Sequence, residues 1–248
     1  MKNLMLSMMV LGGSLSFVSA QNLKTVQYKD DAQKLNGMIT SNAGKKLPGV
    51  LILPAWKGID NEAKTAALNL EKQGYVVLIA DIYGEGNVPK DNTEAAKIAT
   101  KYKQDYKAYQ ERIKLALDEL KKQGAHPEKI AVIGYCFGGT GALETARANF
   151  PVVGVVSIHG GLAKDKQRPN IALSTKILVE HPADDKSVSK EDYDNLVQEM
   201  NEGKADWQII TYANSGHTFT NPESKDYNKV MADRAWDHTL LFLKEILK

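Results

Sequence analysis

Short apolar runs alternate along the chain with longer segments of mixed polarity. Residues 49–53 and 75–80 are almost wholly apolar, which is typical of strands buried on both faces of a sheet. Between these runs, residues 61–73 carry apolar side chains at helical spacing, and Gly74 ends the segment. The same patterns predict further strands at 25–28, 35–40, 129–134, 152–158, 176–180 and 207–212, and further helices at 93–122, 137–148, 190–202 and 229–247.

Strands that alternate with helices indicate βαβ units and a mostly parallel sheet. Right-handed crossovers would then place helices on both faces, which predicts a three-layer α/β fold. The first two strands are expected to form a hairpin at the edge of the sheet. Residues 81–92 contain two glycines and a proline and are expected to form a loop. No change in composition marks a second domain, so we expect residues 21–248 to form one domain.

The chain has 248 residues, of which 43% are hydrophobic and 25% charged, as is typical of a globular protein. Its net charge of +2 gives no concentrated basic character, so we expect no nucleic-acid partner. It contains one cysteine, Cys136, which excludes an internal disulfide framework and a multi-cysteine metal site. This cysteine is therefore either an inert core residue or a reactive one.

Residues 1–20 have the pattern of a secretory signal peptide. Lys2 is followed by an interrupted apolar stretch, and Val18-Ser19-Ala20 supplies the small residues of a cleavage site. An uncleaved anchor is the alternative, but the stretch is short for a membrane span of about 20 residues. We predict cleavage before Gln21, a secreted or periplasmic protein, and no membrane association after cleavage.

The strongest chemical signal is the sequence Gly134-Tyr-Cys136-Phe-Gly138-Gly between a predicted strand and a predicted helix. This G-x-C-x-G pattern is that of a nucleophile elbow, with cysteine in place of the usual serine. Bulky side chains at 134 or 138 would clash in so sharp a turn. The helix that follows would favour the thiolate, and the Phe137 N–H would face a developing oxyanion. The alternative is that Cys136 is a small buried hydrophobic residue.

An elbow nucleophile requires an acid and then a histidine later in the chain. His217 follows the last predicted strand in a glycine-flanked loop and best fits the base. Asp184 and Asp185 both follow the strand at 176–180, and spacing alone does not choose between them. The remaining histidines fit the order less well, because they precede or adjoin the acid or lie within the last helix: His126, His159, His181 and His238.

The chain resembles the dienelactone hydrolase family of α/β-hydrolases. The resemblance is carried by the elbow at 134–139, by Ala183-Asp-Asp185 and by Gly216-His-Thr-Phe219, in that order. It implies a triad of Cys136, His217 and Asp185, although Pro182 stands in place of the family's glycine. It also implies that the backbone N–H of Trp56 is the second oxyanion donor beside that of Phe137. Trp56 fits equally well as an aromatic residue of the core or pocket wall.

Two positions depart from the founding enzyme of the family. Ala55 stands where that enzyme has a glutamate that helps to activate its cysteine, and Asn221 stands where it has a substrate-binding arginine. We therefore predict a hydrolase of small esters or lactones rather than that enzyme's own substrate, working without metal or organic cofactor. A thioesterase or peptidase with the same triad, and a non-catalytic or redox-sensing protein, are the alternatives. The oligomeric state is left open.

Overall fold

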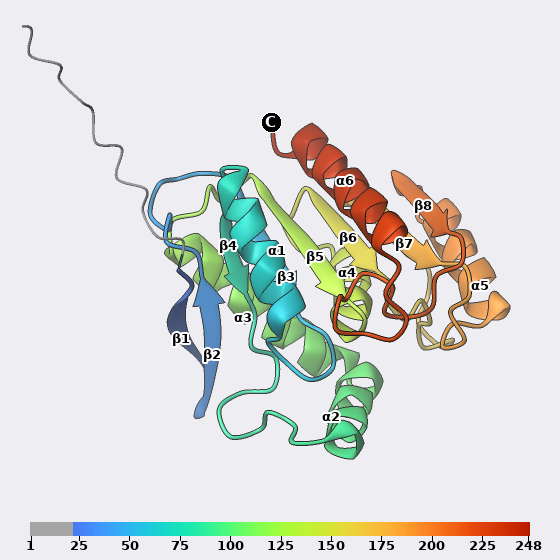
Figure 1. Ribbon diagram of the computed structural model, residues 1–248, viewed down its shortest axis with the longest axis horizontal. Helices are drawn as coiled ribbons and strands as arrows, with labels where there is room; N and C mark the ends of the chain where they lie inside the picture. The colour runs from blue at the N-terminus through green and yellow to red at the C-terminus, as the bar shows by residue number, and fades with distance from the viewer. Residues whose placement is uncertain (1–21) are drawn as a thin grey trace, which may run out of the picture.

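Eight strands form one sheet in the order β1-β2-β4-β3-β5-β6-β7-β8 (Figure 1). The computed structural model describes residues 22–248, so the predicted signal peptide lies outside the described residues. The strands are β1 (Lys24–Asp30), β2 (Gln33–Ile39), β3 (Gly49–Leu53), β4 (Val76–Ile79), β5 (Ile130–Tyr135), β6 (Gly154–Ile158), β7 (Lys176–Pro182) and β8 (Trp207–Tyr212).

The first two strands form the predicted hairpin at one edge of the sheet. β1 pairs with β2 and β2 with β4 in antiparallel fashion, whereas β3 to β8 pair in parallel. Since the parallel strands all point the same way, their carboxyl ends lie at one edge, where loops can bring distant residues together.

Helices cover both faces of the sheet, which confirms the predicted three-layer α/β architecture. Val50 and Ile52 of β3 belong to the apolar cluster under α1 and α6, whereas Leu51 and Leu53 belong to the cluster under the other helices. This alternation follows from the two-residue period of a strand. The helices are α1 (Asn61–Lys72), α2 (Asn92–Gln104), α3 (Tyr106–Lys122), α4 (Phe137–Arg147), α5 (Lys190–Glu202) and α6 (Lys229–Ile246).

The prediction of a single helix at residues 93–122 is wrong, because two helices occupy this segment. Asp105 separates α2 from α3 with φ −99° and ψ 72°. Its side chain accepts a hydrogen bond from Ala108 N–H, while its own N–H donates to the carbonyl of Lys101. One aspartate thus ends one helix and caps the next, a role that the side chain favours over a position inside a helix.

The last helix packs as its apolar pattern predicts. Leu243 and Leu247 are buried in the cluster that α6 shares with α1, and Trp236 and Leu240 pack against it. No helix within residues 22–248 combines the length and the apolar character needed to cross a bilayer.

Candidate active site

Cys136 lies in the turn between β5 and α4 and has a left-handed backbone with φ 53° and ψ −111°. The two glycines that frame it are required by space. A Cβ atom at Gly134 would lie 1.9 Å from the carbonyl oxygen of Gly138, and a Cβ atom at Gly138 would lie 1.9 Å from that of Leu53. The elbow expected from the sequence is therefore present, and its strained backbone holds the cysteine at the edge of the sheet.

His217 joins Cys136 to an aspartate. Its Nε2 lies 3.1 Å from Cys136 Sγ, and its Nδ1 lies 2.8 Å from an oxygen of Asp185. The histidine lies between β8 and α6, and the aspartate follows β7, so three loops at the same edge of the sheet supply the group. Asp185 is buried, whereas Asp184 is exposed and makes no side-chain hydrogen bond among the described residues. The geometry thus brings Asp185, not Asp184, to His217.

Contact between Asp185 and His217 favours the charged form of each side chain. Burial alone would raise the pKa of Asp185, but hydrogen bonds from His217 and Ser187 outweigh it and lower the pKa to about 2. Burial alone would lower the pKa of His217, but its bonds to Asp185 and Cys136 raise the pKa to about 10. At neutral pH the aspartate is therefore ionised, and the imidazole holds a proton strongly in this arrangement.

Ser187 is a member of the site that the sequence analysis missed. Its hydroxyl donates a 2.6 Å hydrogen bond to Asp185, its N–H donates to the same oxygen at 2.9 Å, and its Oγ lies 3.0 Å from His217 Nδ1. These contacts fix the carboxylate plane beside the imidazole. The sequence signal for Ser187 is its position two residues after Asp185, where its N–H and hydroxyl can donate hydrogen bonds to the carboxylate in a turn.

His159 also contacts Cys136, but through the backbone. The N–H of Cys136 is shared between the carbonyl of Ile158 at 3.0 Å and His159 Nδ1 at 3.1 Å. Since Nδ1 accepts, Nε2 carries the proton that is shared with Thr220 Oγ1 at 2.9 Å. Thr220 in turn donates to Glu62 at 2.6 Å, which completes a chain from the elbow to α1.

The environment of His159 keeps its ring neutral. Burial, reinforced by the nearby His217, lowers the pKa of His159 to about 3. His159 fits the expected order of acid and histidine less well, because it precedes the acid along the chain. Its place directly after β6, the strand beside the elbow strand, was the signal that could have found it.

The two backbone donors expected at an oxyanion hole lie at the ends of neighbouring strands. Phe137 is the first residue of α4, so its N–H has no partner within the helix. Trp56 follows β3, and its N–H donates to no other backbone group among the described residues. Its carbonyl accepts a 2.8 Å hydrogen bond from the hydroxyl of Tyr83, which orients the peptide, while its ring packs against the core.

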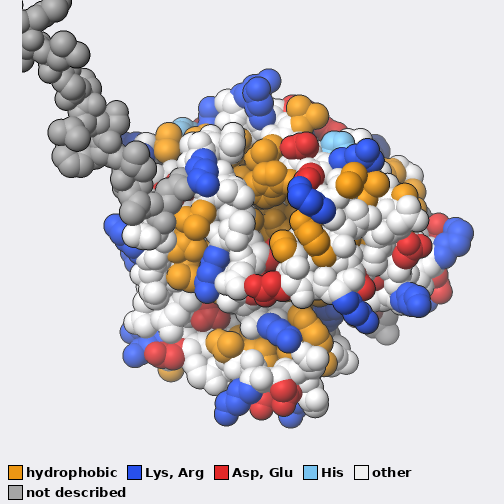
Figure 2. Space-filling model, in the orientation of Figure 1, with side chains coloured by type: hydrophobic (Ala, Val, Ile, Leu, Met, Phe, Trp, Pro, Cys, Tyr) orange, Lys and Arg blue, Asp and Glu red, His pale blue; other side chains and the backbone are white. Residues whose placement is uncertain are grey.

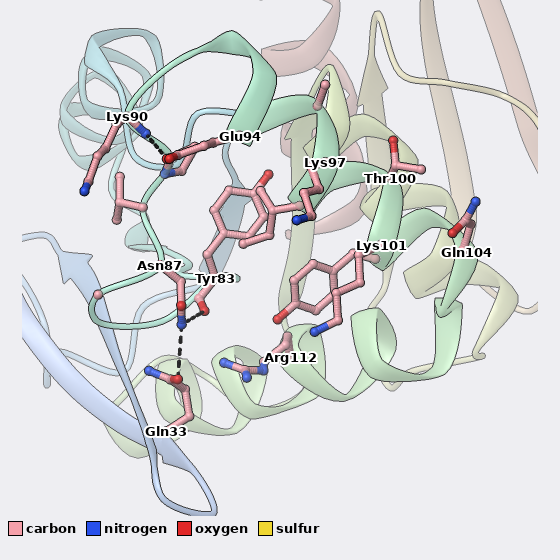
Figure 3. A pocket seen from close by; sticks show the side chains of 16 residues that line it. Gln33, Tyr83, Asn87, Lys90, Glu94, Lys97, Thr100, Lys101, Gln104 and Arg112 are labelled. Atoms are coloured by element: carbon pink, nitrogen blue, oxygen red, sulfur yellow. Dashed lines mark hydrogen bonds between the residues drawn. The ribbon is translucent and has the colours of Figure 1, made fainter.

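Tyr83 also borders a large open pocket of about 960 Å³ (Figure 3). Its ring lies 5.6 Å from that of Phe137, so it stands between the pocket and the elbow. Figure 3 shows Lys97 and Lys101 on α2 and Arg112 on α3 extending toward this space. Lys57, which adjoins Trp56, is exposed.

Two of the other histidines contact tyrosines. His238 is bonded to Tyr212, and His181 packs beside Tyr193. Phe219 is fully buried against Tyr212, and its ring lies 6.0 Å from that of His159. Within residues 22–248, no three His, Cys, Asp or Glu side chains are grouped so that they could hold a metal ion.

Comparison with known proteins places the chain in a family. The model of the dienelactone hydrolase family matches residues 35–247. A Bradyrhizobium protein named "probable 2-oxo-3-(5-oxofuran-2-ylidene)propanoate lactonase" is 28% identical over 211 residues, which cover 80% of this chain and 84% of the relative.

Solved structures agree with the family model. A dienelactone hydrolase-like promiscuous phosphotriesterase from metagenomic libraries is 30% identical, has a TM-score of 0.86, and is matched over 93% of this chain and 100% of its own. A second structure, m3DLH, is 28% identical with a TM-score of 0.87 and the same coverage. The chain therefore belongs to the dienelactone hydrolase family and has the α/β-hydrolase fold.

Proposed function

We propose that the protein hydrolyses small carboxylic esters or lactones, with Cys136 as nucleophile, His217 as general acid and base, and Asp185 as the residue that orients the histidine. The observation that carries the proposal is the position of the His217 ring, 3.1 Å from Cys136 Sγ on one side and 2.8 Å from Asp185 on the other. Nucleophile, base and orienting acid in contact are the arrangement that activates a nucleophile for acyl transfer.

Acylation begins with attack of the Cys136 thiolate on the carbonyl carbon. A sulfur–carbon bond forms, and the carbonyl π electrons move onto the oxygen, which the N–H groups of Phe137 and Trp56 stabilise. When that oxyanion collapses, the carbon–oxygen bond to the alcohol breaks, and His217 Nε2 gives its proton to the departing oxygen. The products of this half-reaction are a thioester on Cys136 and the alcohol, or the open chain of a lactone.

Deacylation uses the same groups in reverse. Water gives a proton to His217 Nε2 as its oxygen attacks the thioester carbon. The sulfur–carbon bond then breaks, which releases the carboxylic acid and restores the thiolate beside a protonated histidine. Asp185 holds the tautomer that keeps Nε2 directed at the sulfur throughout.

We propose that the His217–Asp185 pair activates Cys136 without a glutamate at position 55. Although burial opposes it, hydrogen bonds to Asp185 and Cys136 raise the pKa of His217 to about 10, so the imidazole can hold a proton 3.1 Å from the sulfur at neutral pH. Part of this increase comes from Cys136 itself, so the sulfur and the imidazole act as a coupled pair.

The substrate class follows from the family and from named relatives. One relative is named as a lactonase, and a solved structure of 30% identity is named as a promiscuous phosphotriesterase. Both names describe attack on an electrophilic centre bearing an oxygen leaving group. We propose uncharged or weakly charged esters and lactones of small size, because Asn221 replaces the arginine that the founding enzyme uses for a carboxylate.

Turnover of a panel of p-nitrophenyl esters and small lactones by the purified chain tests the proposal. The Cys136→Ala variant should show no turnover above background, and a thioester of the substrate acyl group should be detectable on Cys136 by intact mass after rapid quenching. Normal turnover by the alanine variant would sink the assignment of the nucleophile, and absence of turnover on every ester and lactone would sink the reaction class.

We further propose that the protein acts outside the cytoplasm, on the basis of the signal-like residues 1–20. Expression of the full chain in a bacterial host, followed by N-terminal sequencing of periplasmic protein, should give Gln21 as the first residue. Recovery of an uncleaved chain from the cytoplasm alone would contradict this proposal.

A further inference from the structure

A second cavity lies on the opposite side of the sheet edge from α2 and α3. It has a volume of about 430 Å³ and is enclosed by α1, α6, the carboxyl ends of β5 to β7 and the loop at 220–227. Figure 2 shows hydrophobic side chains gathered in the hollow between these two helices. The size is in the range of small-molecule sites, and neither Cys136 nor His217 lines it.

The charge around this cavity has one sign. Its lining includes the carboxyl groups of Glu62, Glu180, Glu223 and Asp233, and none of the described residues that line it is a lysine, arginine or histidine. Two of these carboxyls, at 223 and 233, are already bonded to Asn61 and Lys229. The other two, at 62 and 180, are supplied by α1 and β7 and have no cationic partner within the described residues.

Glu180 is the decisive residue. Its side chain is fully buried, one oxygen accepts a 3.0 Å hydrogen bond from Thr239, and the other oxygen has no partner among the described residues. Tyr135, with a 4% exposed side chain, lines the same cavity. Native proteins leave few buried polar atoms unpaired, so an orphan oxygen that borders a cavity indicates a missing partner.

The walls of the cavity indicate the kind of partner. Trp236 and Tyr135 offer aromatic faces, and Ile158, Ala66 and Ala235 offer apolar surface. Aromatic faces next to carboxylates are the environment that holds organic ammonium groups. A bare metal ion does not fit, because within residues 22–248 no three carboxyl or histidine groups converge on one point.

We propose that this cavity binds a small organic cation, with an ammonium group directed at Glu180 and Glu62 and a short apolar body against Trp236 and Ile158. Burial raises the pKa of Glu62 to about 7 and the pKa of Glu180 well above its ordinary value, so both groups tend to keep a proton when no cation faces them. A bound cation would offset this desolvation and favour the ionised carboxylates. The site goes beyond ester hydrolysis, since Cys136, His217 and Asp185 all lie outside its lining.

A chain of hydrogen bonds nevertheless connects the cavity to the elbow. Glu62 and Thr220 line it, and Thr220 contacts His159, which accepts the N–H of Cys136. An occupant that contacts Glu62 is thus separated from the backbone of the nucleophile by two side chains.

Calorimetric titration of the purified chain with 2-phenylethylammonium tests the proposal, with 2-phenylethanol as the neutral molecule of matched shape. We expect the cation to bind with a Kd below about 1 mM and the alcohol at least tenfold more weakly. Binding should be unchanged in the Cys136→Ala variant, so the result is independent of any hydrolysis. Equal binding of the two compounds, or no binding of the cation, would overturn the proposal.

Three variants locate the site. Glu180→Gln keeps the shape and the acceptor for Thr239 but removes the charge, and should weaken cation binding at least tenfold. Ala232→Phe adds an aromatic ring to the lining of the cavity from α6 and should abolish binding. This variant keeps the test valid if Glu180→Gln, which changes a buried residue, folds poorly. Asp237→Asn removes an exposed charge from the same helix outside the cavity and should have no effect. Loss of binding in Asp237→Asn equal to that in Glu180→Gln would overturn the assignment.

Discussion

Cys136 is contacted by two histidines whose rings lie 5.4 Å apart and whose protonation differs completely. His217 contacts the sulfur, and its pKa is raised to about 10; His159 contacts the backbone N–H, and its pKa is lowered to about 3. Both belong to loops at the same edge of the sheet, so position in the fold does not explain the difference. The difference arises from what each ring touches.

His217 has an ionised carboxylate in direct contact at 2.8 Å, and its side chain is 27% exposed. His159 is 1% exposed, and the acid nearest to it along its hydrogen bonds, Glu62, is separated from it by Thr220. Burial without a directly bonded counter-charge removes the proton, whereas a directly bonded carboxylate retains it. A charged ring can then serve the chemistry at sulfur, while a neutral ring can accept the backbone N–H.

Exchanging each histidine for asparagine tests this contrast most strongly. His217→Asn removes the proposed general acid and base, and should lower kcat/KM on a p-nitrophenyl ester on the order of 10⁴-fold. In His159→Asn the side-chain oxygen can still accept the N–H of Cys136, so the loss should stay within about tenfold. Comparable losses in the two variants would show that the rings do not have the distinct roles assigned to them.

The aspartate that sets the charge of His217 gives the next largest effect. Asp185→Asn should lower kcat roughly 10³-fold, because an amide at this position favours the wrong tautomer of the imidazole. Asp184→Asn is the matched control, since the neighbouring carboxylate is exposed, and its activity should equal that of the unmodified chain. If both variants retain activity, the triad is refuted; if Asp184→Asn alone loses it, the acid is misassigned.

Ser187 refines the comparison, because its hydroxyl donates to the carboxylate that is bonded directly to His217. Ser187→Ala removes the 2.6 Å hydrogen bond to Asp185 and should lower kcat about tenfold, the usual magnitude for a hydrogen bond to a charged group. Ser189→Ala, two residues further on, removes the cap of α5 and should reduce the urea midpoint without changing kcat. An unchanged kcat in Ser187→Ala would mean that the backbone N–H of residue 187 and the bond to His217 are enough to orient the carboxylate.

The two histidines should also give opposite dependences of stability on pH. The pKa of His217 is about 10 in the folded chain and has its ordinary value of 6.5 in the unfolded chain, so the contribution of His217 to stability is full below pH 6.5 and is lost as pH rises toward 10. His159 stays neutral in the folded chain down to about pH 3, so its contribution is full above 6.5 and is lost as pH falls toward 3.

Urea unfolding from pH 4 to pH 10 measures this smallest effect. The free energy of unfolding should depend less on pH between 4 and 6 in His159→Asn, and less between 7 and 10 in His217→Asn. The same change of slope in both variants and in both ranges would contradict the assignment of opposite charge states.

The sequence was sufficient for the parts of the site that depend on local pattern. The elbow could be predicted because Gly134 and Gly138 are the residues that permit a tight turn between a buried strand and a helix. The order of acid and histidine along the chain then pointed to Asp185 or Asp184 and to His217. The alternation of strands and helices likewise predicted the layers of the sheet.

Other parts depend on contacts between distant segments, for which the sequence carries little signal. His159 and Thr220 are 61 positions apart, and Thr220 and Glu62 are 158 apart, so their chain of hydrogen bonds exists only once the sheet has formed. Asp105 was missed for another reason. The helical pattern on either side of it is continuous, and one capping side chain is a weak signal against that pattern.

The solitary cysteine has a practical consequence for measurement. Since Cys136 is the single thiol of the chain and is partly accessible, a maleimide or iodoacetamide reporter can enter one position without any other cysteine being removed. The moles of reporter bound would then count the molecules with an open active site. A spin label or fluorophore attached there would also sense any rearrangement of the loops after β7 and β8 that supply Asp185 and His217.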